Sequence, residues 1–225
     1  MKIRVFCDFD GTVARNDVGN LVFTKFGDAS KWWEKVADWQ EGRLEGRQLW
    51  LLQAEHTRMT EAELDEFIAP QAVDPTFPGF VVFCRQHKIP LYIVSDGMDA
   101  YIKRILQRHG LGDLPVRCNR MDISAEGALD ISFPYYEQGC GVCANCKGMH
   151  VENESQPDET TVYIGDGYSD KCALAVADIT FAKEDLLKYC REKNVPCRAF
   201  HDFRDVQREL ERLLHQGMDG GESGF

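Results

Sequence analysis

Three short apolar runs, far apart in the sequence, each end abruptly in polar residues. Runs of this length, rich in β-branched residues, are typical of buried strands. Helical patterns separate the runs, and this alternation favours an α/β fold built on a doubly wound parallel sheet. The carboxyl ends of parallel strands meet at one edge of such a sheet, where ligands bind. The runs and the polar residues that follow them are 3–7 with Asp8, 90–94 with Ser95, and 161–164 with Asp166.

The segment 15–76 differs from the rest of the chain because it contains helical patterns but no strand-like run. Asp17 is a candidate N-cap for its first helix, and Thr60 with Glu63 has the spacing of a capping box that begins another helix. We therefore expect a small helical cap domain. The expected division is a core domain of 1–14 and 77–216, a cap domain of 15–76 and a flexible tail of 217–225.

Trp32, Trp33 and Trp39 recur in this segment at roughly helical spacing. Large aromatic side chains at such positions pack in the core more often than they enclose a ligand. We therefore expect these tryptophans to be core residues.

The chain has 225 residues, a formal net charge of −11 and 44% hydrophobic residues, which is enough to bury a sizeable core. The negative charge disfavours nucleic acid and anionic membranes as partners. An anionic substrate would therefore need a metal or a few placed basic residues. The first residues lack the apolar segment of a signal peptide, and no run is long enough to span a membrane. We expect a cytoplasmic protein that is a monomer or a homodimer.

Asp8 and Asp10 follow the first run and share one side, because side chains alternate along a strand. They could be loop acids that cap the next helix. Alternatively they carry out phosphoryl transfer, with Asp8 as the nucleophile that forms an aspartyl-phosphate. Asp10 would then protonate the leaving oxygen and later deprotonate the attacking water. The polar ends of the other two runs favour this second interpretation.

The same chemistry requires a divalent cation, and Mg²⁺ is the expected cofactor. Asp8, Asp166 and the backbone carbonyl of Asp10 offer the hard oxygen ligands that Mg²⁺ prefers. The metal would offset the repulsion between the nucleophile and a phosphate dianion.

A phosphate group also needs hydrogen-bond donors and a cation of the protein. Ser95 and the backbone amides near Gly97 are candidates for the donors, and Lys147 is the candidate cation. The expected partner is a small phosphorylated metabolite.

The four motifs together resemble those of the haloacid dehalogenase (HAD) superfamily of phosphatases. The resemblance implies a Rossmann-like core with a helical cap inserted after the first strand, as in phosphoserine-phosphatase-like members. It also implies the roles given above and makes Asp170 an acid of the metal site, in direct contact with the metal or behind it. The motifs are Asp8-Phe9-Asp10-Gly11-Thr12, Ser95, Lys147 and Gly165-Asp166-Gly167-Tyr168-Ser169-Asp170.

Further segments resemble the methylthiopentenyl-phosphate phosphatase family of methionine salvage, and this likeness spans nearly the whole chain. It implies 2-hydroxy-3-keto-5-methylthiopentenyl-1-phosphate or a related ester as the substrate. The chain departs at Asp96, where the family pattern has Gly. The segments are Tyr92-Ile93-Val94-Ser95, Cys118-Asn119-Arg120, Cys143-Ala144-Asn145-Cys146-Lys147, Phe181-Ala182-Lys183-Glu184-Asp185 and His201-Asp202-Phe203.

Other functions stay open. Phosphoserine phosphatases carry Glu near the position of Asp17, so this shorter acid is a possible substrate contact. Phosphoserine, phosphoethanolamine and phosphocholine are alternative substrates. A phosphotransferase or mutase on the same fold would use the same aspartyl-phosphate but shield it from water. A non-catalytic binding protein would have lost one of the motifs, and none is lost.

Cys140, Cys143 and Cys146 repeat a two-residue spacing that suits a zinc knuckle or a redox pair. A zinc site needs a fourth ligand, for which His150 and Cys118 are candidates. The default interpretation is a tight loop of reduced thiols that positions Lys147. The remaining cysteines are expected to be reduced thiols, several of them buried; they are Cys7, Cys84, Cys118, Cys172, Cys190 and Cys197.

Overall fold

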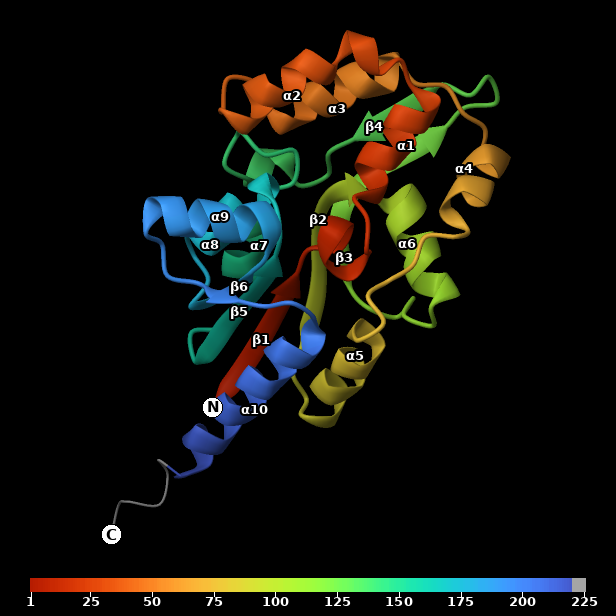
Figure 1. Ribbon diagram of the computed structural model, residues 1–225. Helices are drawn as coiled ribbons and strands as arrows, with labels where there is room; N and C mark the ends of the chain where they lie inside the picture. Colours follow the sequence, from red (N-terminus) through yellow and green to blue (C-terminus); the bar gives the residue numbers. More distant parts are fainter. Residues whose placement is uncertain (220–225) are drawn as a thin grey trace.

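The computed structural model describes residues 1–219 and centres on a seven-stranded sheet in the order β4-β3-β2-β1-β5-β6-β7 (Figure 1). Neighbouring strands pair in parallel, except that β3 and β4 are antiparallel. The predicted α/β fold with a doubly wound parallel sheet is thus confirmed. The strands are β1 (Lys2–Cys7), β2 (Leu91–Met98), β3 (Val116–Ile123), β4 (Leu129–Ser132), β5 (Glu159–Gly165), β6 (Ile179–Ala182) and β7 (Arg198–Ala199).

Helices and short turns connect these strands. The helices are α1 (Val18–Phe26), α2 (Trp33–Gln40), α3 (Gly46–Glu55), α4 (Glu61–Ile68), α5 (Phe77–Gln86), α6 (Asp99–Arg108), α7 (Lys147–Glu154), α8 (Lys171–Leu174), α9 (Glu184–Lys193) and α10 (Phe203–Asp219). The turns are η1 (Phe9–Val13), η2 (Ala29–Lys31), η3 (Tyr136–Gln138) and η4 (Tyr168–Asp170).

β1 lies at the centre of the sheet and determines where a ligand can enter. Val5 pairs with Leu91 of β2 on one side and with Val162 of β5 on the other. The chain therefore builds the sheet outward from β1 in both directions, and the connections diverge at its carboxyl end. Asp8, the next residue after β1, is placed at this divergence.

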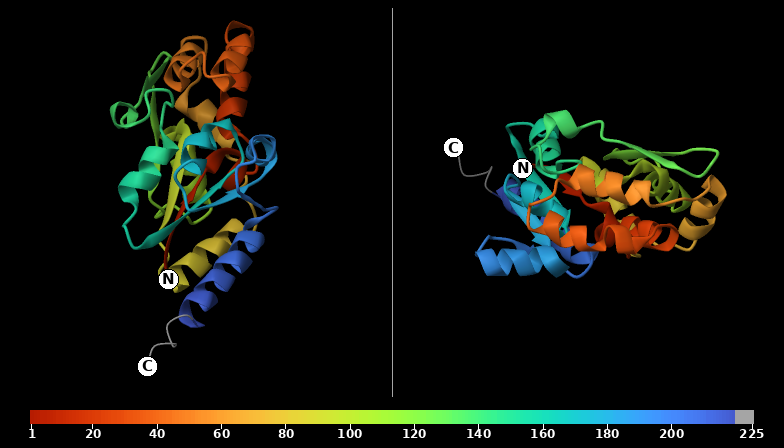
Figure 2. Two further views of the ribbon diagram at one scale, coloured as in Figure 1. Left: turned by 90° about the vertical axis from the view of Figure 1, so that its left-hand side faces the viewer. Right: turned by 90° about the horizontal axis from the view of Figure 1, so that it is seen from above.

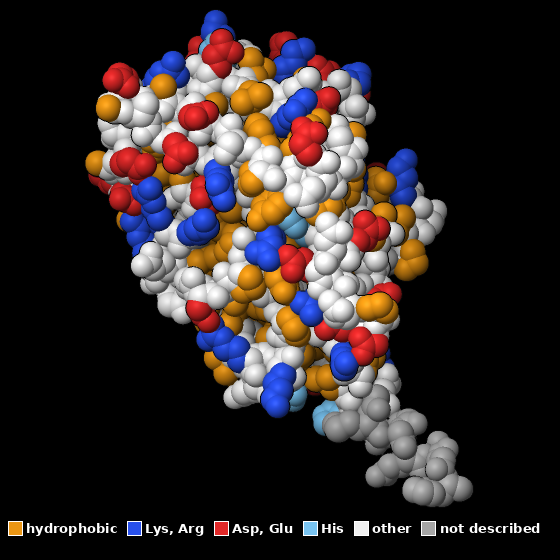
Figure 3. Space-filling view, turned by 180° about the vertical axis from the view of Figure 1, so that it is seen from behind, with side chains coloured by type: hydrophobic (Ala, Val, Ile, Leu, Met, Phe, Trp, Pro, Cys, Tyr) orange, Lys and Arg blue, Asp and Glu red, His pale blue; other side chains and the backbone are white. Residues whose placement is uncertain are grey.

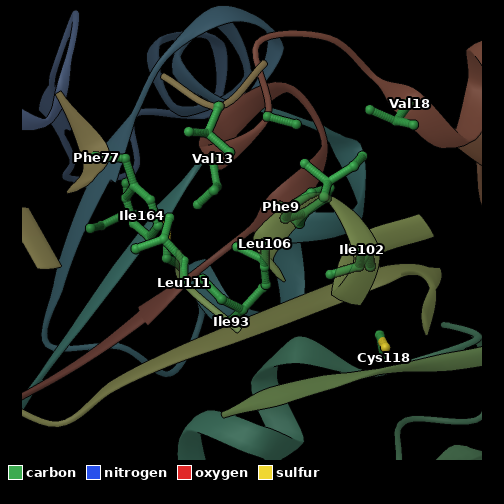
Figure 4. Packing of buried hydrophobic residues seen from close by; sticks show 14 of the residues in the cluster. Phe9, Val13, Val18, Phe77, Ile93, Ile102, Leu106, Leu111, Cys118 and Ile164 are labelled. Carbon is green, nitrogen blue, oxygen red and sulfur yellow. The ribbon is translucent and has the colours of Figure 1, made fainter. Parts of the chain in front are cut away.

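Helices cover both faces of the sheet. Alternate residues of each strand point to opposite faces, so each central strand packs against both layers of helices. Val5 and Cys7 belong to the larger apolar cluster, part of which is drawn in Figure 4 with Ile102 and Leu106 of α6. Phe6 belongs to a smaller cluster that contains Val151 of α7 and Ala173 of α8. The period-two pattern of β1 thus anchors it between two apolar layers.

Helices α1 to α4 come from the segment between β1 and β2, and α1, α2 and α3 stand over the carboxyl end of the sheet (Figures 1 and 2). Asp17 caps α1 by accepting a hydrogen bond from the backbone of Asn20 at 2.8 Å. The capping box of Thr60 and Glu63 is also present at the start of α4. We retain as a proposal that residues 15–76 form a cap domain on a core of 1–14 and 77–216.

The last helix is longer than the sequence pattern predicted. We expected a flexible tail over 217–225, but α10 runs from Phe203 to Asp219 and so includes the start of that segment. Gly217 costs about 1 kcal/mol in a helix, which does not by itself end one. The helix lies beside α5, where Phe203 packs on Phe77 with ring centroids 4.8 Å apart (Figure 2). The rest of the predicted tail, 220–225, lies outside the described residues.

The surface drawn in Figure 3, opposite to the view of Figure 1, carries Lys and Arg side chains interspersed with Asp and Glu side chains. Within residues 1–219, no helix has the length and the apolar character needed to cross a bilayer.

Candidate active site

A cavity of about 530 Å³ lies between the carboxyl end of the sheet and helices α2 and α3. It has the size typical of sites for small ligands. The residues predicted from sequence come to it from four separate segments of the chain. Those that line it are Asp8, Asp10, Asp17, Ser95, Gly97, Lys147 and Asp166, and Asp170 adjoins it through a contact with Lys147.

Lys147, the first residue of α7, is the centre of a buried ion-pair network. Its Nζ lies 2.7 Å from Asp8 Oδ1 and 2.6 Å from Asp170 Oδ1, and only 1% of the lysine is exposed. Burial lowers the pKa of Lys147, but the attraction of Asp170 and Asp8 outweighs it and the pKa rises. Burial raises the pKa of Asp8, and the lysine opposes that effect. Lys147 is therefore a permanent cation beside the candidate nucleophile.

Asp170 has both carboxylate oxygens occupied by the protein. Its Oδ1 accepts hydrogen bonds from Lys147 and from the hydroxyl of Tyr163. Its Oδ2 accepts from the backbone N–H groups of Asp166 and Gly167, each at 2.9 Å. We therefore propose that Asp170 acts from behind the metal site, by orienting Lys147 and the loop that carries Asp166.

Asp10 lies where the loop after β1 meets the start of α1. Its Oδ1 accepts hydrogen bonds from the backbone of Val18 at 2.8 Å and of Gly19 at 3.2 Å. Its Oδ2 accepts from the hydroxyl of Tyr101 at 2.8 Å. Burial, and then the charge of Asp17, raises the pKa of Asp10 to about 7. A carboxyl group with that pKa can both give and take a proton at neutral pH.

The approach of Tyr101 to Asp10 requires a glycine at position 97. A Cβ on Gly97 would lie 1.9 Å from the Tyr101 hydroxyl and 2.7 Å from Asp10 Oδ2. The Gly97 N–H donates to Ser95 Oγ at 3.0 Å. Ser95 and Gly97 both line the cavity, and we propose that they exchange this bond for bonds to phosphate oxygens.

Asp8 and Asp166, with Asp170 behind them, form a group that suits a divalent cation. Oxygens of Asp8, Asp166 and Asp170 lie within 4.8 Å of one another. Burial, and then the charge of Asp170, raises the pKa of Asp166 to about 6, so the acids repel one another when they are ionised. Hard oxygen donors held this close fit Mg²⁺, which would relieve that repulsion.

Gly11 permits the close approach of Asp166. It has a φ of +73°, which favours glycine, and a Cβ there would lie 2.3 Å from Asp166 Oδ2. Thr12 then donates to Asp166 Oδ1 at 2.7 Å. The turn after β1 therefore positions the acid that follows β5.

Asp96, where the chain departs from the family pattern, ties three segments together. Its Oδ1 accepts from the backbone of Asn145 at 2.7 Å, and its Oδ2 accepts from the indole of Trp50 at 3.3 Å. Asn145 in turn donates to the backbone carbonyl of Ser95 at 2.8 Å. These contacts connect α3, the loop before Lys147 and the end of β2. No sequence pattern identified this role.

The wall of the cavity opposite the acids is aromatic. Trp33, Trp39 and Trp50 line it, together with Val36 and Leu49. The expectation that the tryptophans are core residues holds for Trp32, which is 1% exposed, but is wrong for Trp33 and Trp39. Helical periodicity predicts which side chains share a face, but it does not tell whether that face meets a core or a cavity.

Asp17, the N-cap residue of α1, is exposed and lines the cavity, so it stays a candidate substrate contact.

Cys140, Cys143 and Cys146 do come together, but outside the cavity lining. Their fourth neighbour is Cys172, which the spacing of the other three did not predict; like them it is a free cysteine. His150 and Cys118 are not part of the group: His150 bonds to Asn145, and Cys118 lies in the larger apolar cluster.

Solved structures share this fold. A structure titled "Phospho-Aspartyl Intermediate Analogue of Phosphoserine phosphatase" superposes with a TM-score of 0.70 at 19% identity, over 92% of this chain and 98% of that one. Cytosolic 5'-nucleotidase IIIB bound to cytidine matches with a TM-score of 0.58 at 11% identity, over 98% of this chain and 87% of that one. These likenesses show that the fold of the chain is that of phosphoserine phosphatase.

The chain belongs to the phosphatase family whose model is described as "Putative Phosphatase", which matches residues 3–195. It is therefore an enzyme of the phosphoric monoester hydrolase class. The 2-hydroxy-3-keto-5-methylthiopentenyl-1-phosphate phosphatase of Bacillus cereus strain ATCC 14579 is 31% identical over 221 residues, which cover 95% of this chain and 98% of the relative. The protein of that name from Bacillus thuringiensis strain Al Hakam is 30% identical over the same coverage.

Proposed function

We propose that this enzyme hydrolyses a small phosphomonoester through an aspartyl-phosphate on Asp8, and that its substrate is 2-hydroxy-3-keto-5-methylthiopentenyl-1-phosphate or a closely related ester. The observation that carries the proposal is the pairing of Asp8 with Lys147 at 2.7 Å, in a cavity that Asp10 and Asp166 also line. A carboxylate, a buried cation and an acid with a pKa of about 7 meet there.

The reaction has two steps. A carboxylate oxygen of Asp8 attacks phosphorus, the bond from phosphorus to the leaving oxygen breaks, and Asp10 gives its proton to that oxygen. Water then attacks the phosphorus of the aspartyl-phosphate and gives a proton to Asp10. Inorganic phosphate leaves, and Asp8 is regenerated.

The chain's own groups stabilise the charge that develops in both steps. Lys147 lies against Asp8, where it can neutralise the equatorial phosphate oxygens, and Ser95 and the Gly97 amide offer hydrogen bonds. Asp8, Asp166 and the backbone carbonyl of Asp10 would hold Mg²⁺, which supplies positive charge to the phosphate group.

The lining of the cavity favours an uncharged, apolar substituent on the ester. Lys147 is the only Lys or Arg among the described residues that line it. The carboxylate of phosphoserine would therefore meet acids and indole rings and find no second cation. The thioether chain of the methylthiopentenyl ester could pack against Trp33, Trp39 and Trp50, and the name of the 31% identical relative supports this choice.

Phosphocholine and phosphoethanolamine are the second candidates, because aromatic faces beside acidic groups also suit ammonium ions. Asp17, Glu184 and Asp185 line the same cavity as the tryptophans. A choline ester would use both features, whereas the thioether ester needs only the aromatic wall.

Phosphate release from a panel of esters tests the proposal. The panel contains the methylthiopentenyl ester, phosphoserine, phosphoethanolamine and phosphocholine, each measured with Mg²⁺ and with EDTA. We expect the methylthiopentenyl ester to give the highest kcat/KM, and EDTA to abolish release until Mg²⁺ is restored. A higher kcat/KM for phosphocholine would overturn the substrate assignment, and full activity in EDTA would overturn the metal assignment.

A phosphotransferase would pass the phosphoryl group to an alcohol instead of water. We therefore repeat the assay with an added alcohol and measure the phosphorylated product. Phosphate release in equal amount with and without the alcohol is the expected result, and preferential transfer to the alcohol would contradict hydrolysis as the physiological reaction.

Replacing Trp39 with Ala tests the aromatic wall. We expect KM for the methylthiopentenyl ester to rise about tenfold, which corresponds to about 1.4 kcal/mol, with kcat nearly unchanged. We expect the loss to fall on binding because Trp39 comes from α2, whereas Asp8, Asp10 and Lys147 come from the carboxyl end of the sheet. Steady-state kinetics measure it, and Leu51→Ala on the exposed side of α3 is the control. An unchanged KM in the Trp39 variant would remove the tryptophan from the binding site.

A further inference from the structure

Four cysteines gather beside the active site in an arrangement that the proposed reaction does not use. Cys140, Cys143 and Cys146 come from the loop between η3 and α7, and Cys172 comes from α8. Their sulfur atoms all lie within 4.8 Å of one another. Cys143 Sγ lies 3.6 Å from Cys172 Sγ, which in turn lies 4.0 Å from Cys140 Sγ.

These distances match a tetrahedron around a single metal ion. A disulfide holds its sulfurs about 2.05 Å apart, and all four cysteines are free. Zinc bonds thiolates at about 2.3 Å, so the sulfurs of a tetrahedral site lie about 3.8 Å apart. An iron–sulfur cluster would need room for bridging sulfides between its ligands, and four sulfurs within 4.8 Å leave none.

The local backbone suits bound thiolates. Cys146 is the N-cap residue of α7, where the positive end of the helix favours a negative sulfur. The N–H of Cys143 donates to Cys140 Sγ at 3.4 Å, so it would offset part of the charge on that sulfur. Residues 139–146 contain neither helix nor strand, so few backbone bonds hold them in place. Cys140 is exposed and gives a metal a path from solvent.

We propose that Cys140, Cys143, Cys146 and Cys172 bind one structural Zn²⁺ ion. With four protein ligands the ion has no open position, so it cross-links the chain and takes no part in catalysis. The inference does not depend on the identity of the substrate, because metal content can be measured without turnover.

The position of the site indicates what the cross-link would do. Cys146 immediately precedes Lys147, and Cys172 lies two residues after Asp170, the partner of that lysine at 2.6 Å. The ion would thus hold together the two segments that carry the buried pair. The same loop reaches helix α3, since the N–H of Gly46 donates to the carbonyl of Val142 at 2.8 Å. Zinc is therefore a positioning element for Lys147 and for one wall of the cavity.

The test is the metal content of the full chain, purified under reducing conditions without chelators and measured by inductively coupled plasma mass spectrometry. We expect one zinc ion per chain that survives a dialysis against EDTA sufficient to remove Mg²⁺. Cys172→Ser and Cys140→Ser are expected to lose it, whereas Cys197→Ser, a half-buried cysteine outside the group, keeps it. Asp166→Asn is expected to keep the zinc, which separates this site from the carboxylate site.

Wild-type protein reconstituted with Co²⁺ provides a second measurement that requires no variant to fold. Four thiolates should give sulfur-to-cobalt charge-transfer absorption and the intense visible bands of tetrahedral cobalt. The proposal would be overturned if the protein, after reconstitution with Zn²⁺, bound far less than one zinc ion per chain. A disulfide within the group, or iron in place of zinc, would also overturn it. So would loss of zinc from Asp166→Asn with retention in Cys172→Ser.

Discussion

Replacing Asp8 with Asn is expected to abolish phosphate release while the fold survives. The amide is nearly the same size and can still accept a hydrogen bond from Lys147, but it cannot act as the attacking nucleophile. Loss of a nucleophile from a catalytic unit costs about 10⁴-fold or more in turnover. Phosphate release with Mg²⁺ and saturating ester measures the effect, and circular dichroism with thermal unfolding checks the fold.

The control for this change is Asp113→Asn, which alters an exposed acid paired with Arg85 at the opposite end of the sheet from the cavity. Its turnover should equal that of the wild type. Turnover within tenfold of wild type in the Asp8 variant would show that another group attacks phosphorus.

Replacing Lys147 with Met is expected to lower both activity and stability. The lysine is 1% exposed and pairs with Asp8 and Asp170, which are 4% and 0% exposed. Removing one partner from a buried ion pair typically costs about 3–5 kcal/mol, because a charge is left buried without compensation. Turnover should fall by about 10³-fold or more, since the cation that neutralises the phosphate is lost. Urea unfolding and phosphate release give the two quantities.

Two variants sharpen this test. Lys103→Met removes a lysine whose side chain is 59% exposed, and its unfolding free energy should change by less than about 0.5 kcal/mol. The double change Lys147→Met with Asp170→Asn should recover part of the lost stability, because one uncompensated acid is also removed. It should not recover activity. A Lys147 variant as stable as the wild type would contradict the buried network.

The α/β fold and most of the residues at the cavity can be predicted without the structure. Asp8, Ser95 and Asp166 follow three apolar runs that could only be central strands, and parallel strands bring their carboxyl ends to one edge. The carboxyl ends of parallel strands meet in every fold of this class. Residues far apart in the sequence can therefore be assigned to one site from the strand pattern alone. The bounds of the final helix were less predictable, because Gly217 weakens a helix but does not end it.

The partners that complete the site follow from the packing of the helices and could not be predicted from the sequence. The hydroxyl of Tyr101 on α6 donates a hydrogen bond to Asp10, and Trp39 of α2 lines the cavity. Neither residue belongs to a recognisable motif. Cys172 joins Cys140 because α8 packs beside the start of α7. The spacing of residues along the sequence predicts only which side chains lie together within one or two turns of the same helix. Contacts between segments depend on how whole helices pack on the sheet, and that packing is set by burial of apolar surface throughout the molecule.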